Sequence, residues 1–156
     1  MKLLQSTSLV FLTNFLHNTW KKEYPYAWLF LLLTIISIFY HSKIFYEYPN
    51  VPELFGYSMH SIIEILDKIV ILSVVIYGFI LICKTIKVNE ISYTPIISFL
   101  SICYLYIGGY FQNKYCFDPN IKVADISHGI LHILSSIGHH VIMYDYWILQ
   151  KMRAIL

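Results

Sequence analysis

Four long apolar segments dominate this chain, and their length limits what it can fold into. They cover residues 25–41, 59–83, 93–112 and 125–148. A membrane-spanning helix needs about 20 mostly apolar residues, within a range of about 17–25. Hydrophobic residues make up 58% of the chain and charged residues 13%, against about 25% charged in ordinary soluble domains. The sequence therefore predicts an all-α integral membrane bundle with four transmembrane helices, in a single domain spanning residues 1–156.

The segment before the first of these spans fits more than one kind of structure. Residues 3–20 are moderately apolar but are interrupted by polar side chains, among them Ser6, Thr7 and Asn14. A fifth span and a short interfacial helix both fit this pattern. A signal peptide fits less well, because no small-x-small cleavage site follows the apolar part. So apolar a chain has too little soluble surface for nucleic-acid binding.

A few polar side chains lie inside the apolar segments and point to a functional site. Ser37 and His41 close the first segment, Asp67 lies in the second, and His128 and His132 open the fourth. A charged group at the bilayer centre costs about 2.5–3.5 kcal/mol on insertion scales. We therefore expect these groups to be paired or to bind something. Because successive spans alternate in direction, all of them should lie at a similar depth near one membrane face.

The spacing of these residues favours a metal site. Ser37 and His41 are four residues apart, as are His128 and His132, so each pair shares one helical face. Three neutral imidazoles and a water molecule form a common catalytic zinc arrangement, in which the pKa of the water falls to about 7. Asp67 could then accept a proton or orient the water. Ser37 could steady the water or polarise a substrate carbonyl.

Each of these residues also has a plain structural interpretation. A single histidine in an apolar helix is most often a hydrogen-bonded packing residue. Asp67 could pair with Lys68, and Ser37 could donate to the carbonyl four residues earlier. Glu64 could replace Asp67 in its role, and His139 could be a deeper ligand or a proton relay. The functional interpretation rests on the group as a whole, because burying several polar groups without a common partner is expensive.

The combined pattern resembles a known superfamily. Ser-x-x-x-His, then Asp on the next helix, then His-x-x-x-His on the last helix is similar to the alkaline ceramidases, the adiponectin/progestin-type receptors and related lipid-remodelling membrane hydrolases. The stretch DISHGILHILSSIG at residues 125–138 looks most like the last helix of the ceramidases. The resemblance implies a Zn²⁺ ion held by three histidines, with a serine and an aspartate on the water side. Carried over, the ligands are His41, His128 and His132, and the water-side pair is Ser37 and Asp67.

The chain also departs from this superfamily. The family has seven spans, whereas this chain has room for four or five, so we expect a shortened member. The loop between His41 and Asp67 is longer than the family leads us to expect. The resemblance implies a multi-pass protein of an endomembrane, such as the endoplasmic reticulum or Golgi. Four or five helices could enclose a lipid cavity either alone or as an oligomer.

Three functions fit the sequence. The first is zinc-dependent hydrolysis of a membrane lipid amide, with a ceramide-like substrate, or of another acyl lipid such as an ester. The second is a non-enzymatic membrane protein with a structural zinc site. The third is haem binding between helices, where two histidines from different helices would be the axial ligands. An i, i+4 pair on one helix fits a single zinc ion better than a haem.

Overall fold

The structure, a computed structural model, describes residues 2–42, 58–86 and 93–155, and within these ranges it contains helices and no strand. Most of the long loop between the first two predicted spans, residues 43–57, lies outside the described part. The helices are α1 (Lys2–Ser8), α2 (Val10–Trp20), α3 (Tyr24–Tyr40), α5 (Met59–Ile86), α6 (Thr94–Cys103), the π-helix η1 (Tyr104–Gly108), α7 (Gly109–Gln112), the 3₁₀-helix η2 (Tyr115–Phe117) and α8 (Ile121–Arg153).

The predicted apolar segments all form helices. Two of them are long and apolar enough to cross a membrane: Met59–Thr85 in α5, and Thr94–Gln112 through α6, η1 and α7. The other two predicted spans correspond to α3, which is apolar but has 17 residues, and to α8, which has 33 residues and is more polar. The all-helical class is confirmed, and the membrane-crossing property belongs by length and composition to two helices.

Local sequence signals explain where the helices start. Pro25 and Pro95 lie in the first turns of α3 and α6, where the missing N–H of proline costs no helical hydrogen bond. Asn120 caps α8, because its side-chain oxygen accepts a bond from the backbone N–H of Lys122 at 3.1 Å. Lys22 adopts a left-handed φ of 63° between α2 and α3 and lets the chain reverse direction there.

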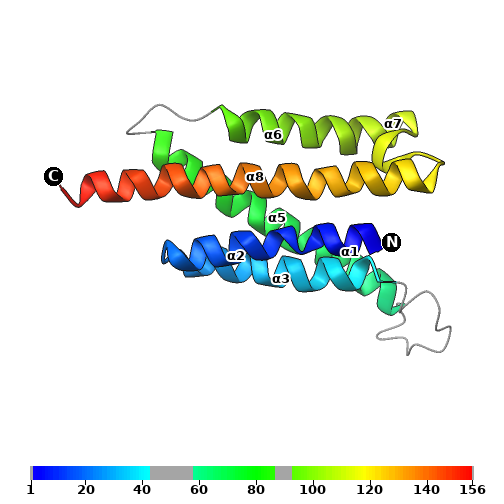
Figure 1. The fold of residues 1–156 in the computed structure, drawn as a ribbon, viewed down its shortest axis with the longest axis horizontal. Coiled ribbons are helices and arrows are strands. Elements are labelled where there is room, and N and C mark those ends of the chain that lie inside the picture. Colours follow the sequence, from blue (N-terminus) through cyan, green and yellow to red (C-terminus); the bar gives the residue numbers. More distant parts are fainter. Residues whose placement is uncertain (1, 43–57, 87–92, 156) are drawn as a thin grey trace.

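The N-terminal segment, residues 3–20, is helical and breaks at Leu9 into α1 and α2. Figure 1 shows α1 and α2 running end to end beside α3, with α8 above them and α6 on the far side of α8. Helix α8 packs against α1, α2, α5 and α6 and so occupies the middle of the bundle.

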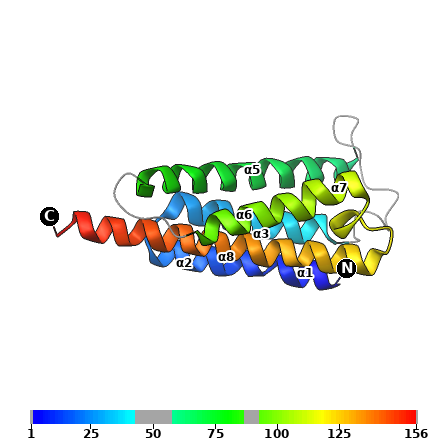
Figure 2. The same cartoon turned by 90° about the horizontal axis from the view of Figure 1, so that it is seen from above.

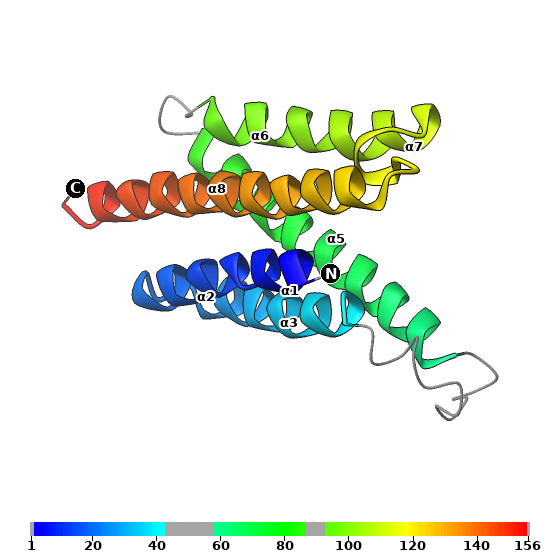
Figure 3. The same cartoon turned by 45° about the vertical axis from the view of Figure 1, so that its right-hand side comes forward.

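Helix α5 lies in a different layer. Figure 2 shows it to one side of the other helices, and Figure 3 shows it crossing them obliquely. It packs against α3 and α8. The buried apolar core lies where α2, α3, α5 and α8 meet. It consists of Phe11, Tyr26, Phe30, Leu33, Val70, Val74, Leu81, Ile142, Met143, Tyr146 and Leu149.

Buried polar side chains and exposed apolar side chains are both common in this bundle. Polar side chains are buried on several helices: Asn14 and Asn18 are each 1% exposed, and Ser136 is 2% exposed. Large apolar side chains cover the outside, as with Phe79, which is 64% exposed, and Phe111, which is 77% exposed. Several polar groups are thus buried beside the apolar core, and many large apolar side chains lie on the outer surface.

Candidate metal centre

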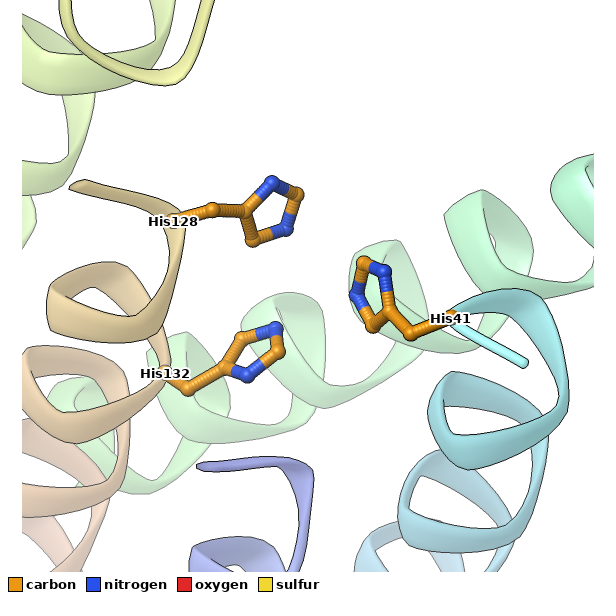
Figure 4. Close-up of side chains that lie close together, drawn as sticks. All are labelled: His41, His128 and His132. Carbon is orange, nitrogen blue, oxygen red and sulfur yellow. The ribbon is translucent and has the colours of Figure 1, made fainter. Parts of the chain in front are cut away.

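Three histidines converge at one end of the bundle. His41 directly follows the last residue of α3, where its backbone N–H donates to the carbonyl of Ser37 at 3.0 Å. His128 and His132 lie four residues apart early in α8. Figure 4 shows the three imidazole rings facing one another, two from α8 and one from the end of α3. The structure thus brings together the three histidines that the sequence predicts as ligands.

The geometry of these rings suits a single metal ion. One nitrogen from each of the three histidines lies within 4.8 Å of the others. The ring centroids are 4.9 Å apart for His41 and His128, 5.4 Å for His41 and His132, and 5.1 Å for His128 and His132. A tetrahedral zinc site with Zn–N bonds of about 2.0–2.1 Å holds its nitrogens about 3.4 Å apart. Closing the rings onto an ion therefore takes side-chain movements of about an ångström.

His132 has further contacts that hold its ring in place. The Nδ1 atom of His132 lies 3.1 Å from the hydroxyl oxygen of Thr7 on α1. The ring of His132 also packs on that of Phe11, with 5.2 Å between centroids. Metal-binding histidines usually donate their second ring nitrogen to an oxygen in this way. Thr7 was not among the residues predicted for the site, although the polar interruptions of residues 3–20 indicated that this segment meets polar partners.

Ser37, the predicted water-side serine, is buried and bonds to α1. It is 2% exposed, and its hydroxyl oxygen lies 2.9 Å from that of Ser8. The Ser8 hydroxyl donates its one hydrogen to the carbonyl of Leu4 at 2.9 Å. Ser37 must then donate to Ser8. The oxygen of Ser37 keeps its acceptor capacity, which suits it to steady a water molecule and not to donate to a substrate carbonyl.

Asp67, the predicted base, is buried on α5 but is not one of the clustered ligands. Its side chain is 8% exposed, and its Oδ1 atom has no hydrogen-bond partner within the described ranges. The cluster of potential metal ligands consists of the three histidines. A different carboxylate, Asp125, interacts electrostatically with both His41 and His128. Asp125 lies one turn before His128, and this spacing of three residues on α8 was the signal available in the sequence.

The other candidate residues have partners of their own. Glu64 forms an ion pair with Lys68 on the outer face of α5, with 2.6 Å between Glu64 Oε1 and Lys68 Nζ. His139 is hydrogen-bonded through Nδ1 to the hydroxyl of Tyr26.

A second pair of histidines joins α8 to α2, with His140 on α8 and His17 on α2. His140 is 2.9 Å from His17 between Nδ1 atoms, and its Nε2 atom is 2.9 Å from the hydroxyl of Thr13. His140 is not one of the three clustered histidines, so it can serve as a control in experiments on them.

Comparison with known proteins adds no relative: no family model matches the chain, and no curated protein or solved structure matches it.

Proposed function

We propose that the chain is a multi-pass membrane protein in which α3, α5, α6–α7 and α8 cross the bilayer, with α1 and α2 beside them. The support is the many large apolar side chains on the outside of the bundle and the polar ones buried within it, because lipid favours apolar side chains outside and requires polar groups to find partners inside. The 17 residues of α3 extend about 25 Å at 1.5 Å per residue, close to the hydrocarbon thickness of about 30 Å. By the resemblance in its motifs, the host membrane is an endomembrane.

Zinc is the proposed occupant of the centre, with His41, His128 and His132 as its ligands. The three nitrogens within 4.8 Å of one another are the observation that carries this proposal. Three imidazoles leave a fourth position for water or substrate, which is typical of catalytic zinc. Haem fits less well, because three rings in mutual contact leave no space for a macrocycle between two of them.

The proposed reaction is hydrolysis of a lipid amide. A zinc ion held by these histidines would supply Lewis acidity and activate water near neutral pH. Asp67 takes a proton from the attacking water as the water oxygen bonds to the carbonyl carbon. The carbon–nitrogen bond then breaks, and that proton passes to the amine. Ser37 accepts a hydrogen bond from the water. The products are a free fatty acid and an amine.

The proposed substrate is ceramide-like. The resemblance in the histidine and serine motifs supports an amide, and the position of the centre near one end of the bundle supports a substrate whose polar head lies close to a membrane face. An ester of the same lipid class is a variant of this proposal, since the same water attack would cleave it.

A structural zinc site is the second candidate, and the position of Asp67 favours it. A carboxylate outside the cluster of ligands could leave the ion without a base. In a structural zinc site the ion would hold the end of α3 to α8, and the protein would hydrolyse no lipid.

Metal analysis combined with a lipid assay tests both candidates. The full chain is purified in detergent, its zinc content is measured, and fatty-acid release from ceramide and phospholipid vesicles is followed. We expect about one zinc per chain in the wild type and in His140→Ala, with zinc and release both lost in His128→Ala. Zinc below about a tenth of an equivalent in the wild type would remove the metal centre. Zinc without release would favour the structural alternative.

A further inference from the structure

Thr7 of α1 makes two hydrogen bonds that bear on the tautomer of His132. The Thr7 hydroxyl donates to the carbonyl of Leu4 at 3.0 Å. A hydroxyl has one hydrogen, so toward the Nδ1 atom of His132, at 3.1 Å, the Thr7 oxygen can only accept. The hydrogen of the neutral imidazole must then lie on Nδ1. The lone pair of His132 is left on Nε2, and only a nitrogen with a free lone pair can bind a metal.

The orientation of the ring agrees with this assignment. Figure 4 shows one nitrogen of His132 directed toward the other two histidines and the other directed toward the N-terminal blue ribbon. The second nitrogen is the one that meets Thr7. The tautomer fixed by Thr7 thus presents its lone pair to the centre of the cluster.

The close approach of α1 to α8 at this point depends on a glycine. Gly129 lies one turn before His132, and a Cβ atom added to it would come within 3.2 Å of the Cγ2 atom of Thr7. That distance is tighter than an ordinary van der Waals contact, so a larger residue would push Thr7 away from the helix. The absent side chain at Gly129 brings the Thr7 hydroxyl within reach of the imidazole.

We propose that Thr7 is a positioning residue of the metal centre, holding His132 in the Nδ1–H tautomer so that Nε2 is ready to bind an ion. This inference rests on the proposed metal site for its purpose, but the tautomer itself is a property of the metal-free protein. Outer hydrogen bonds of this kind typically change metal affinity by about 10–100-fold. Helix α1 therefore belongs to the centre although it supplies no ligand.

The test uses two variants of Thr7 and one matched control. Thr7→Val keeps the shape of the side chain and removes the acceptor, whereas Thr7→Ser keeps the hydroxyl. Thr13→Val makes the same change in the other threonine–histidine pair, with His140. Nitrogen NMR of the ¹⁵N-histidine-labelled, metal-free protein reads the tautomer of His132, which is assigned by its loss in His132→Gln. A competition titration with Zn²⁺ alone reads the affinity.

We expect the hydrogen on Nδ1 of His132 in the wild type, in Thr7→Ser and in Thr13→Val. Thr7→Val should give a mixture of tautomers and a zinc affinity lower by about 10–100-fold. A wild-type His132 with its hydrogen on Nε2 would overturn the inference without any variant, and so would a Thr7→Val protein with unchanged tautomer and affinity. A wild type that has the expected tautomer but binds no zinc would instead overturn the proposed function and leave the tautomer assignment standing.

Discussion

The imidazoles of His41 and His128 meet edge to face, with 4.9 Å between ring centroids and 85° between ring planes. The two rings belong to different helices, one at the end of α3 and one in α8. Nothing in the local sequence of either helix fixes this contact, so it depends on how α3 and α8 are placed relative to each other. An ion shared between these rings would therefore stabilise the packing of α3 on α8.

Zinc should accordingly raise the stability of the folded protein. An ion that binds only the folded state at about 100 times its Kd adds about 2.7 kcal/mol. We expect the unfolding midpoint in detergent to rise on adding Zn²⁺ and to fall again on adding a chelator. His41→Gln should lose this response, because the two remaining ligands both lie on α8. His140→Gln, outside the centre, should keep it, and a response to zinc in His41→Gln equal to the wild type would contradict the assigned ligand set.

The role of Asp67 can be separated from metal binding. Asp67→Asn keeps the size of the side chain but cannot accept a proton, so we expect normal zinc content and hydrolysis reduced by about 10²–10⁴-fold. Glu64→Gln is the matched control on the same helix, because Glu64 lies in an outward ion pair with Lys68. It should hydrolyse lipid at the wild-type rate. Full activity in Asp67→Asn together with loss in Asp125→Asn would transfer the base role to the carboxylate that interacts with His41 and His128.

How far the sequence predicts this centre depends on whether a relationship lies within one helix or between helices. The spacing of His128 and His132 is set by helical geometry, so their shared face could be predicted. The approach of His41 to His128 and His132 could be predicted because successive apolar segments were expected to alternate in direction. The placement of Asp67 depends on the oblique crossing of α5 (Figure 3), which the sequence pattern does not encode, and it stays outside the ligand cluster.

The N-terminal segment shows the same limit. Its polar residues could be read from the sequence, but their partners on α8 could not, because these contacts join residues more than 120 positions apart, as in Thr7–His132 and Asn14–Ser136. The pattern of these polar residues fitted both a fifth span and a short interfacial helix. In the fold they face α8 and α3.

Gly78 is a packing position that should tolerate no side chain. A Cβ atom there would lie 2.8 Å from the hydroxyl oxygen of Tyr26 and 3.2 Å from the ring of His139. We expect Gly78→Ala to destabilise the protein by about 1–3 kcal/mol, as overpacking of a core does. Gly108→Ala is the control, because the nearest atom to its added Cβ is 3.7 Å away on Tyr104. It should be neutral or slightly stabilising in unfolding titrations, since alanine favours a helix over glycine.

Removing the Tyr26 hydroxyl should partly rescue Gly78→Ala. The double variant Gly78→Ala, Tyr26→Phe removes the atom that makes the closest contact, so its loss of stability should be smaller than the sum of the two single losses. Additive losses would show that the clash lies elsewhere.

Asn18 should be replaceable by an apolar residue with a gain in stability. It is 1% exposed, and neither polar atom of its amide has a hydrogen-bond partner within residues 2–42, 58–86 and 93–155. A buried polar group without a partner costs about 1–3 kcal/mol, so we expect Asn18→Leu to unfold at a higher denaturant concentration than the wild type. Asn14→Leu is the comparison, because the oxygen of the Asn14 amide also has no partner in the described part of the chain but its nitrogen donates to Ser136. It should gain less than Asn18→Leu, since it gives up that bond. A loss of stability in Asn18→Leu would mean that the amide binds a water molecule or another ligand in the folded protein.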